Sequence, residues 1–218
     1  GPQAAYSRSK YDAERLLIGM ADDSFCPTIL RKGTIYGFSP RMRYDLVGNT
    51  FVKDALAGAG LSLYSGGEMW RPLLDVRDAA RAYIACLEAE EDTVKGEVFN
   101  VCHSNMRISE LSLRTRQTLD SVGVEVQILP DYRERNERSY RVSTRKIEQV
   151  LGFRPEVTVE ASVVDMVKRI SPLRRTDLDN PKYYNIRWMR LLDESYREAH
   201  PTGSVFDVDG RLPSAERS

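Results

Sequence analysis

Stretches with a helical spacing of apolar residues alternate along this chain with short apolar runs of strand character. Residues 4–21 show the helical spacing, and the run Thr28–Tyr36 that follows stops at Gly37, as a buried strand does. The same patterns predict further helices over residues 45–57, 78–88, 109–119, 143–150 and 159–170, and strands over residues 61–64, 98–101 and 124–129. This order predicts an α/β fold, because helices that alternate with strands pack against a sheet.

The expected ends of three helices are marked by one aspartate, one serine and one glycine. Asp78 and Ser109 are predicted N-caps, since a side-chain oxygen at that position accepts a backbone N–H of the first turn. Gly152 is the predicted C-terminal stop of the helix over residues 143–150.

The charge balance limits the classes of partner. The chain has 32 basic and 32 acidic residues, whereas nucleic acids and anionic membranes attract an excess of Lys and Arg. No run of about 18 apolar residues is present to span a bilayer. We therefore expect neither a nucleic acid nor a membrane as partner. The polar start of the chain predicts that there is no signal peptide.

The cysteines and histidines exclude several chemistries. Cys26, Cys86 and Cys102 are odd in number and widely spaced, which favours free thiols in a reducing, cytoplasmic compartment. The two histidines, His103 and His200, are too few for a zinc site or a Ser-His-Asp grouping, so we expect no metal. The acidic run over residues 88–92 is interpreted as a solvated helix end.

One pair of side chains can carry acid–base chemistry. Tyr6 and Lys10 are four residues apart on the first predicted helix and therefore share a face. A neighbouring ammonium group favours the phenolate and lowers the pKa of a tyrosine, which then can take a proton from an alcohol. The plainer interpretation is an ordinary surface tyrosine and lysine, because this spacing also arises by chance.

The context of this pair resembles a known family. In order along the chain come Tyr6-x-x-x-Lys10, Leu30-Arg31-Lys32-Gly33-Thr34-Ile35-Tyr36-Gly37, Asn49, Trp70-Arg71-Pro72, residues 75–82, Phe99-Asn100-Val101, residues 138–143 and residues 151–153. From about Ala4 to Ile170 the chain resembles the extended short-chain dehydrogenase/reductases, and specifically their nucleotide-sugar epimerase and dehydratase branch.

The resemblance implies a role for each matched residue. Tyr6 would be the general acid/base that deprotonates a sugar hydroxyl during hydride transfer, and Lys10 would bind the nicotinamide ribose. With them, Gly33 and Thr34 would contact the cofactor, NAD or NADP. The implied contacts to a nucleotide-diphosphate sugar are Thr34, Asn49, Arg71 and Arg138, with Arg41 and Arg43 as weaker candidates, because a guanidinium group suits paired phosphate oxygens.

The resemblance also implies a fold and its division. Residues 1–37 and 72–103 would be the later elements of a Rossmann-type parallel sheet domain, and residues 38–71 and 104–170 a small α+β substrate-binding domain. No G-x-G-x-x-G run is present, and Gly58-Ala59-Gly60 lacks the third glycine. We therefore expect the C-terminal portion of an enzyme, without the glycine-rich half.

The matched motifs, without the glycine-rich motif, are compatible with two functions. The first is the C-terminal portion of an NAD(P)-dependent nucleotide-sugar epimerase or dehydratase. The alternative is a non-catalytic module that binds a nucleotide sugar or associates with another subunit. The expected protein partner is a second copy or a chain that supplies the missing half, since missing strands expose apolar surface.

Residues 171–218 lie outside the resemblance. They are interpreted as a C-terminal extension that starts with a polar linker. The apolar side chains between Tyr183 and Leu192 predict one docking helix, and the residues from Pro201 onward are expected to fray.

Overall fold

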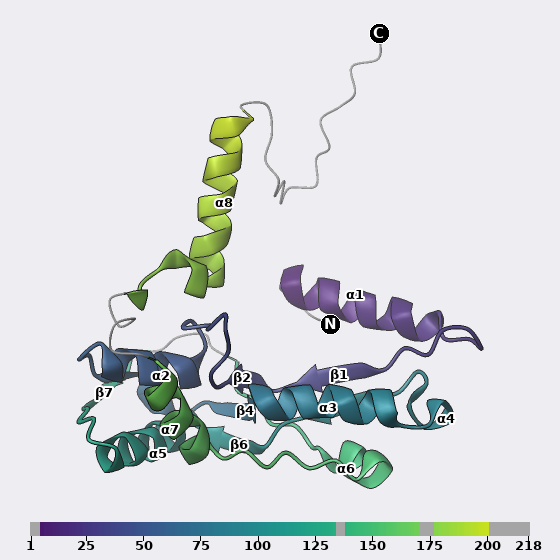
Figure 1. The fold of residues 1–218 in the computed structure, drawn as a ribbon, viewed down its shortest axis with the longest axis horizontal. Helices are drawn as coiled ribbons and strands as arrows, with labels where there is room; N and C mark the ends of the chain where they lie inside the picture. The colour runs from purple at the N-terminus through teal and green to yellow at the C-terminus, as the bar shows by residue number, and fades with distance from the viewer. Residues whose placement is uncertain (1–4, 134–137, 171–176, 201–218) are drawn as a thin grey trace.

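The structure is a computed structural model that describes residues 5–133, 138–170 and 177–200 (Figure 1). The helices are α1 (Ala5–Gly19), α2 (Val47–Leu56), α3 (Val76–Glu88), α4 (Glu91–Val94), α5 (Ile108–Ser121), α6 (Arg145–Leu151), α7 (Val159–Arg169) and α8 (Asn185–Ala199). The strands are β1 (Ile29–Lys32), β2 (Thr34–Tyr36), β3 (Leu61–Tyr64), β4 (Trp70–Asp75), β5 (Val98–Val101), β6 (Ser104–Arg107) and β7 (Ile128–Asp131). The described elements therefore form an α/β fold, as the sequence predicts.

The strands pair in three groups, and most pairs are parallel. β1 runs parallel to β5, with Ile29 opposite Val98. β4 lies between β2, which is parallel to it, and β6, which is antiparallel. β3 and β7 form a third, parallel pair. In Figure 1, α1 lies along β1, and α2, α5 and α7 gather at the opposite end of the molecule.

The apolar side chains form two buried clusters. One joins α2, α5 and α7 to β3, and its fully buried members include Phe51, Leu61 and Met166. The other lies between α3, α6 and the β1–β5 pair, around Phe99 and Ile147. The predicted division into two interleaved domains is compatible with two clusters but stays a prediction.

One expected strand is in fact two strands. The run over residues 28–36 was expected to be continuous, but it breaks at Gly33, so that β1 and β2 belong to different sheets. A Cβ atom on Gly33 would lie 2.8 Å from the Pro72 carbonyl oxygen and 3.2 Å from Cys102 Cβ. The chain passes this close to its neighbours only because residue 33 has no side chain.

Both predicted N-caps are wrong, whereas the predicted C-terminal glycine is confirmed. The N-cap of α3 is Asp75, whose carboxylate accepts from Arg77 N at 2.8 Å. Asp78 is instead buried inside the helix. Ser109 lies within the first turn of α5, after Arg107. Gly152 ends α6 in the left-handed region at φ 62°.

Three strands differ from the expected pattern. β4 and β6 were not predicted, because Pro72 and the polar residues of β6 interrupt any alternation. The strand expected over residues 124–129 begins only at Ile128, where the backbone pairs with β3. Tertiary pairing therefore decides these elements.

The C-terminal extension docks differently from the prediction. Within the described part of the chain, α8 has no buried residue, and Ile186 is 68% exposed. The docking residues precede the helix: Leu178 is buried, and Tyr183 and Tyr184 pack against the apolar cluster around α2. The prediction of fraying from Pro201 lies outside the described residues.

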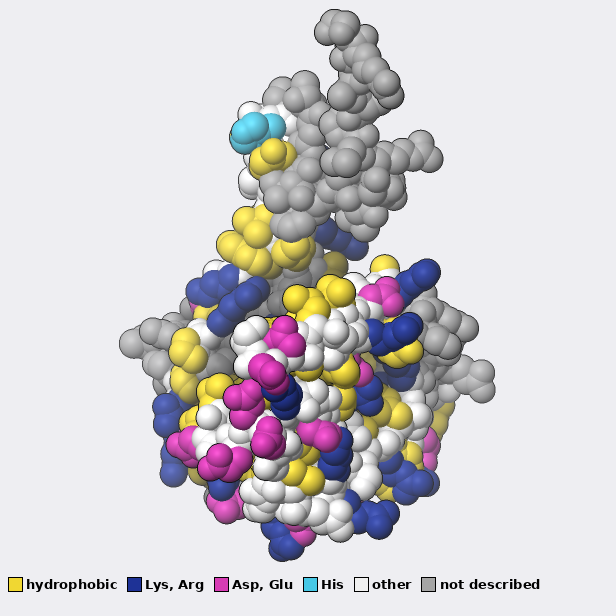
Figure 2. All heavy atoms as spheres, turned by 90° about the vertical axis from the view of Figure 1, so that its right-hand side faces the viewer, with side chains coloured by type: hydrophobic (Ala, Val, Ile, Leu, Met, Phe, Trp, Pro, Cys, Tyr) yellow, Lys and Arg dark blue, Asp and Glu magenta, His cyan; other side chains and the backbone are white. Residues whose placement is uncertain are grey.

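The end of the molecule that carries α4 has an acidic surface. Glu88, Glu90, Glu91 and Asp92 are all exposed, as the interpretation of a solvated helix end requires. Figure 2 shows acidic side chains on this end, interspersed with basic ones. No helix among the described residues is long and apolar enough to cross a membrane.

Candidate active site

Helix α1 carries the Tyr6–Lys10 pair on one face. The residues lie one helical turn apart, and Lys10 Nζ is 5.8 Å from the centroid of the Tyr6 ring. Tyr6 is 73% exposed, so its hydroxyl is open to a ligand. Ser9 Oγ donates to the Tyr6 carbonyl oxygen at 2.9 Å, which tightens the turn between the two residues.

Two neighbouring hollows share this pair. One, of about 570 Å³, lies between α1 and β1 and includes Gly33 in its lining. The other, of about 600 Å³, is lined also by Pro72, Asn100 and Tyr140. The structure thus brings Tyr6, Lys10 and Gly33 together, as predicted. Thr34 follows Gly33 directly as the first residue of β2. It pairs with Leu73 of β4, in the sheet that does not contain β1.

Two basic side chains of β1, Arg31 and Lys32, line both hollows. Arg31 forms an ion pair with Glu14 of α1, which ties the helix to the strand. Lys32 hydrogen-bonds the hydroxyl of Tyr83 on α3. Glu14 also lines both hollows and offsets the charge of Arg31, so Lys10 and Lys32 supply the net positive charge of the lining, which favours an anionic ligand.

Arg71 and Arg138, which are 67 residues apart in sequence, contact each other beside helix α1. The Arg71 guanidinium donates to the Arg138 carbonyl oxygen, and Arg138 Nη2 donates to Ser7 Oγ at 2.9 Å. Ser7 follows Tyr6 on α1. The two arginines predicted to hold a diphosphate therefore lie next to the predicted acid/base. Ser7 was missed, because no sequence pattern signals a contact across 131 residues.

Side chains hold the segment of Arg138 in place. Asn105 on β6 donates to the Val142 carbonyl oxygen and accepts from Val142 N, both at 2.9 Å. Its amide thus imitates the hydrogen bonding of a neighbouring strand. Trp70 N donates to Ser139 Oγ at 3.0 Å, and the Arg141 guanidinium lies 4.9 Å from the Trp70 ring.

Asn49 has a different environment from the two arginines. Its side chain is buried, accepts from Gly37 N at 2.9 Å and donates to the Arg43 carbonyl oxygen at 3.1 Å. Both ends of the amide therefore hold the loop between β2 and α2, and the predicted substrate contact stays a prediction. Arg43 is paired with Asp45 through two hydrogen bonds.

Arg71 also lines a smaller hollow of about 220 Å³. Its other walls include Asp45 and Thr50, from the region of α2, and Ser62 and Tyr64, from β3. A guanidinium group, a carboxylate and hydroxyl groups therefore line the same hollow. The sequence did not signal Asp45 or Thr50 as members of this site.

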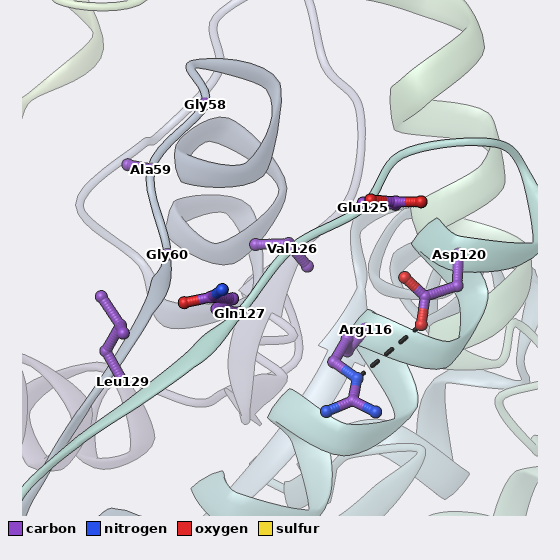
Figure 3. A pocket seen from close by; sticks show the side chains of 9 residues that line it. All are labelled: Gly58, Ala59, Gly60, Arg116, Asp120, Glu125, Val126, Gln127 and Leu129. Carbon is purple, nitrogen blue, oxygen red and sulfur yellow. Dashed lines mark ion pairs between the residues drawn. The ribbon is translucent and has the colours of Figure 1, made fainter.

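A further hollow contains none of the predicted site residues (Figure 3). It measures about 490 Å³ and lies beside Gly58, Ala59 and Gly60. Its Arg116 and Asp120 pair with each other on α5 at 3.7 Å. The three residues Gly58–Gly60 lead from α2 into β3, and not from a strand into a helix. This loop therefore lacks the geometry that cradles a dinucleotide pyrophosphate.

The structure also describes the environment of a buried thiol and of the possible metal ligands. Burial raises the pKa of the Cys102 thiol to about 11, which disfavours the reactive thiolate. In the described ranges, no group of three or more His, Cys, Asp and Glu side chains could hold a metal ion.

Comparison with known proteins identifies relatives of this chain. Residues 1–102 match the NAD dependent epimerase/dehydratase family. A dTDP-glucose 4,6-dehydratase of Escherichia coli is 25% identical over 207 residues, which are 89% of this chain and 53% of the relative. The dTDP-glucose 4,6-dehydratase 1 of Escherichia coli strain K12 is 28% identical over 176 residues, 74% of this chain and 46% of the relative. The chain spans about half the length of these relatives.

Solved structures share the fold. UDP-glucose 4-epimerase from Thermotoga maritima superposes with a TM-score of 0.66 at 23% identity, over 81% of this chain and 55% of its own. The Bordetella bronchiseptica enzyme WbmF, in complex with NAD⁺ and UDP, gives a TM-score of 0.66 at 21% identity, over 89% of this chain and 58% of its own. These similarities confirm the predicted Rossmann-type α/β class.

Proposed function

We propose, from the relationship of this chain to the extended short-chain dehydrogenase/reductases of the nucleotide-sugar epimerase and dehydratase branch, that it carries the acid–base and substrate-binding portion of such an enzyme. One observation carries the proposal: Tyr6 and Lys10 line one hollow with Ser7, Arg138 donates to Ser7, and Arg71 donates to the Arg138 carbonyl oxygen. A proton-transfer pair and two phosphate-binding side chains thus adjoin, although they come from distant parts of the sequence.

In this proposal, each side chain has a distinct task. Tyr6 exchanges a proton with a sugar hydroxyl, and Lys10 supplies positive charge on the same helical face. Arg71 and Arg138 hold the diphosphate of a nucleotide-diphosphate sugar, since guanidinium groups bind paired phosphate oxygens with two parallel hydrogen bonds. Thr34 and Asn49 are proposed as further substrate contacts.

The cofactor proposed is NAD or NADP. A solved relative contains NAD⁺ and another, RMD from Pseudomonas aeruginosa, contains NADPH. The hollow along β1, with Tyr6, Lys10 and Gly33, fits the nicotinamide end. The glycine-rich turn for the pyrophosphate is not in this sequence, so a second polypeptide segment must supply it. When bound, the nicotinamide accepts or returns a hydride.

A non-catalytic module is the second candidate. Among the described residues, β1 pairs only with β5, and α1 has no buried residue. Leu16 of α1 and Met20, which directly follows the helix, are exposed. An unpaired strand edge and exposed apolar side chains favour association with another chain. A second copy or a chain with the missing half is the proposed occupant.

Separate titrations with UDP, dTDP and NAD, followed by calorimetry, distinguish the two candidates. Binding of a nucleoside diphosphate, and of NAD once the glycine-rich half is supplied as a second chain, supports the enzyme. Binding of a nucleoside diphosphate without NAD in that assembly supports the module. Arg138→Ala should weaken nucleotide binding about tenfold or more, because a hydrogen bond to a charged group is lost. Arg116→Ala, in the remote hollow of Figure 3, is the matched control and should bind as the wild type does. Failure to bind any of the three ligands contradicts the enzyme and leaves only association with another chain.

The catalytic role of Tyr6 needs an assembled enzyme. With the glycine-rich half supplied as a second chain, Tyr6→Phe should reduce turnover about 10² to 10⁴-fold while nucleotide affinity stays unchanged. The variant keeps the ring and removes only the hydroxyl. Unchanged turnover in Tyr6→Phe would exclude Tyr6 as the acid/base.

A further inference from the structure

Helix α8 projects away from the other helices, and its base is packed against the body of the protein (Figure 1). The backbone amide of Tyr44 donates to the Tyr183 carbonyl oxygen at 3.0 Å, and the two rings lie edge-on with 5.1 Å between their centroids. Leu178 is buried in the same apolar cluster. The residues before α8 therefore hold the helix at one place on the folded protein, where it is open to a partner.

One face of α8 is apolar, and no residue on it is buried. Five large apolar side chains recur at helical spacing and form the apolar face of α8: Trp188, Met189, Leu191, Leu192 and Tyr196. Met189, Leu191 and Leu192 are exposed, and Trp188 and Tyr196 are partly exposed. Single exposed apolar residues are ordinary, but a continuous apolar face indicates a surface that a partner covers.

The charged residues of α8 are divided between its two halves. The first half contains Arg187 and Arg190 and no acidic residue. The second half contains three acidic residues, Asp193, Glu194 and Glu198. Its single basic residue, Arg197, is paired with Asp193 at 2.8 Å. This division opposes the helix macrodipole, which favours acidic side chains near the N-terminus and basic ones near the C-terminus. The stability of the helix by itself therefore does not explain the charge pattern.

The charge pattern fits a second copy of the same helix. When two identical helices lie antiparallel about a two-fold axis, the first half of each faces the second half of the other. The basic half of α8 then lies beside an acidic half twice, whereas a parallel pair would bring like charges together. With the axis at Leu192, the central residue of α8, each Trp188 lies opposite the Tyr196 of the other copy.

We propose that the apolar face of α8 is an interface between two copies of this chain, which pair through antiparallel α8 helices. The surface is separate from α1 and the edge of β1, and the inference does not depend on the function proposed above. One helix from each copy makes a small interface, at the low end of the range for specific complexes, so we expect a dimer that dissociates in the micromolar range.

Sedimentation of the full chain from about 1 to 100 μM measures the association. We expect the wild type to change from monomer to dimer over this range. Leu192→Glu brings two buried charges together at the axis and should keep the chain monomeric. The matched control is Leu87→Glu, which changes an exposed leucine of α3 and should dimerise as the wild type does.

Charge reversal tests the antiparallel arrangement without changing the apolar face. Arg187→Glu with Arg190→Glu makes both halves of α8 acidic, and Glu194→Lys with Glu198→Lys makes both halves basic. Each double variant alone should dimerise about tenfold more weakly than the wild type, because like charges meet across the axis. An equimolar mixture of the two should regain the affinity of the wild type, a result that misfolding of either variant cannot produce.

Several outcomes would overturn the inference. A wild type that stays monomeric over the whole range refutes it and leaves residues 201–218 or another protein to cover the face. A dimer that persists in Leu192→Glu but is lost in Leu16→Glu, on α1, assigns the association to the β1 edge instead. Should Leu192→Glu lose its far-ultraviolet circular dichroism signal, the charge variants decide, and a mixture that does not regain affinity refutes the antiparallel pair. Titration with UDP measures nucleotide binding separately, so the proposed function stands or falls by itself.

Discussion

The buried carboxylate of Asp78 offers a quantitative test of how the fold is held together. Its Oδ2 accepts the backbone amides of Glu156 and Val157, at 2.9 Å and 2.7 Å, and its Oδ1 accepts from Arg81 Nη1 at 2.9 Å. Asp78 is fully buried in α3, whereas residues 156 and 157 come from the segment between α6 and α7. The side chain therefore connects elements 78 and 79 residues apart.

The cost of its removal follows from the number of donors left without a partner. An unsatisfied buried donor costs about 1–3 kcal/mol, and the amides of Glu156 and Val157 are only partly buried, so the lower end applies to each. Asp78→Ala should therefore lower the free energy of unfolding by about 2 kcal/mol. Asp78→Asn keeps one oxygen for both amides and loses mainly the exposed Arg81 pair, so it should cost about 1 kcal/mol.

Urea unfolding, followed by far-ultraviolet circular dichroism, measures the loss of unfolding free energy in each variant. If the free energy of unfolding falls with urea concentration at the same slope in all of them, the variants unfold between comparable states. Glu156→Gln is the control, because it removes the other, exposed partner of Arg81 and keeps the backbone amide. Its effect should stay within about 0.5 kcal/mol. The reasoning fails if Asp78→Ala costs less than about 1 kcal/mol, or if Asp78→Asn costs as much as Asp78→Ala.

Three further predictions concern single residues. Gly33→Ala should lower the free energy of unfolding by about 1–3 kcal/mol in the same assay, because the new Cβ meets the Pro72 carbonyl oxygen; no loss would contradict the close approach. Asn105→Ala should accelerate hydrogen exchange at the Val142 amide, which loses its acceptor, and an unchanged rate would mean that another group holds this segment. Burial raises the pKa of the Cys102 thiol to about 11, so this thiol should resist alkylation at pH 8 in the folded protein and react after unfolding. Mass spectrometry measures the labelling, and rapid labelling in the folded state would refute the burial of Cys102.

Local patterns in the sequence predict a large part of the fold. The helical spacing over residues 159–170 predicts α7 nearly to its ends, and the apolar runs over residues 61–64 and 98–101 coincide with β3 and β5. These elements are determined by side chains close together in sequence. β4 escapes such a prediction because it contains Pro72 and charged residues, and its strand character comes from pairing with β2 and β6.

The candidate site divides in the same way. The spacing of Tyr6 and Lys10 on one helix is a local property and is visible in the sequence. The contact of Arg138 with Ser7 is decided by the path of the chain around β4, and no local signal reveals it. The structural role of Asn49 is likewise hidden in the sequence, since both ends of its side chain are bound to backbone groups of residues 6 and 12 positions away.

Helix α8 has a mechanical consequence. The residues before it, Tyr183 and Tyr184, pack against the apolar cluster around α2, and in Figure 1 the helix projects away from the other helices. At 1.5 Å per residue, its 15 residues make a lever arm of about 22 Å. A rotation of about 10° at the base would therefore sweep Ala199 through about 4 Å. A spectroscopic label at the far end of α8 would turn a small rotation of the residues at its base into a readable change of distance.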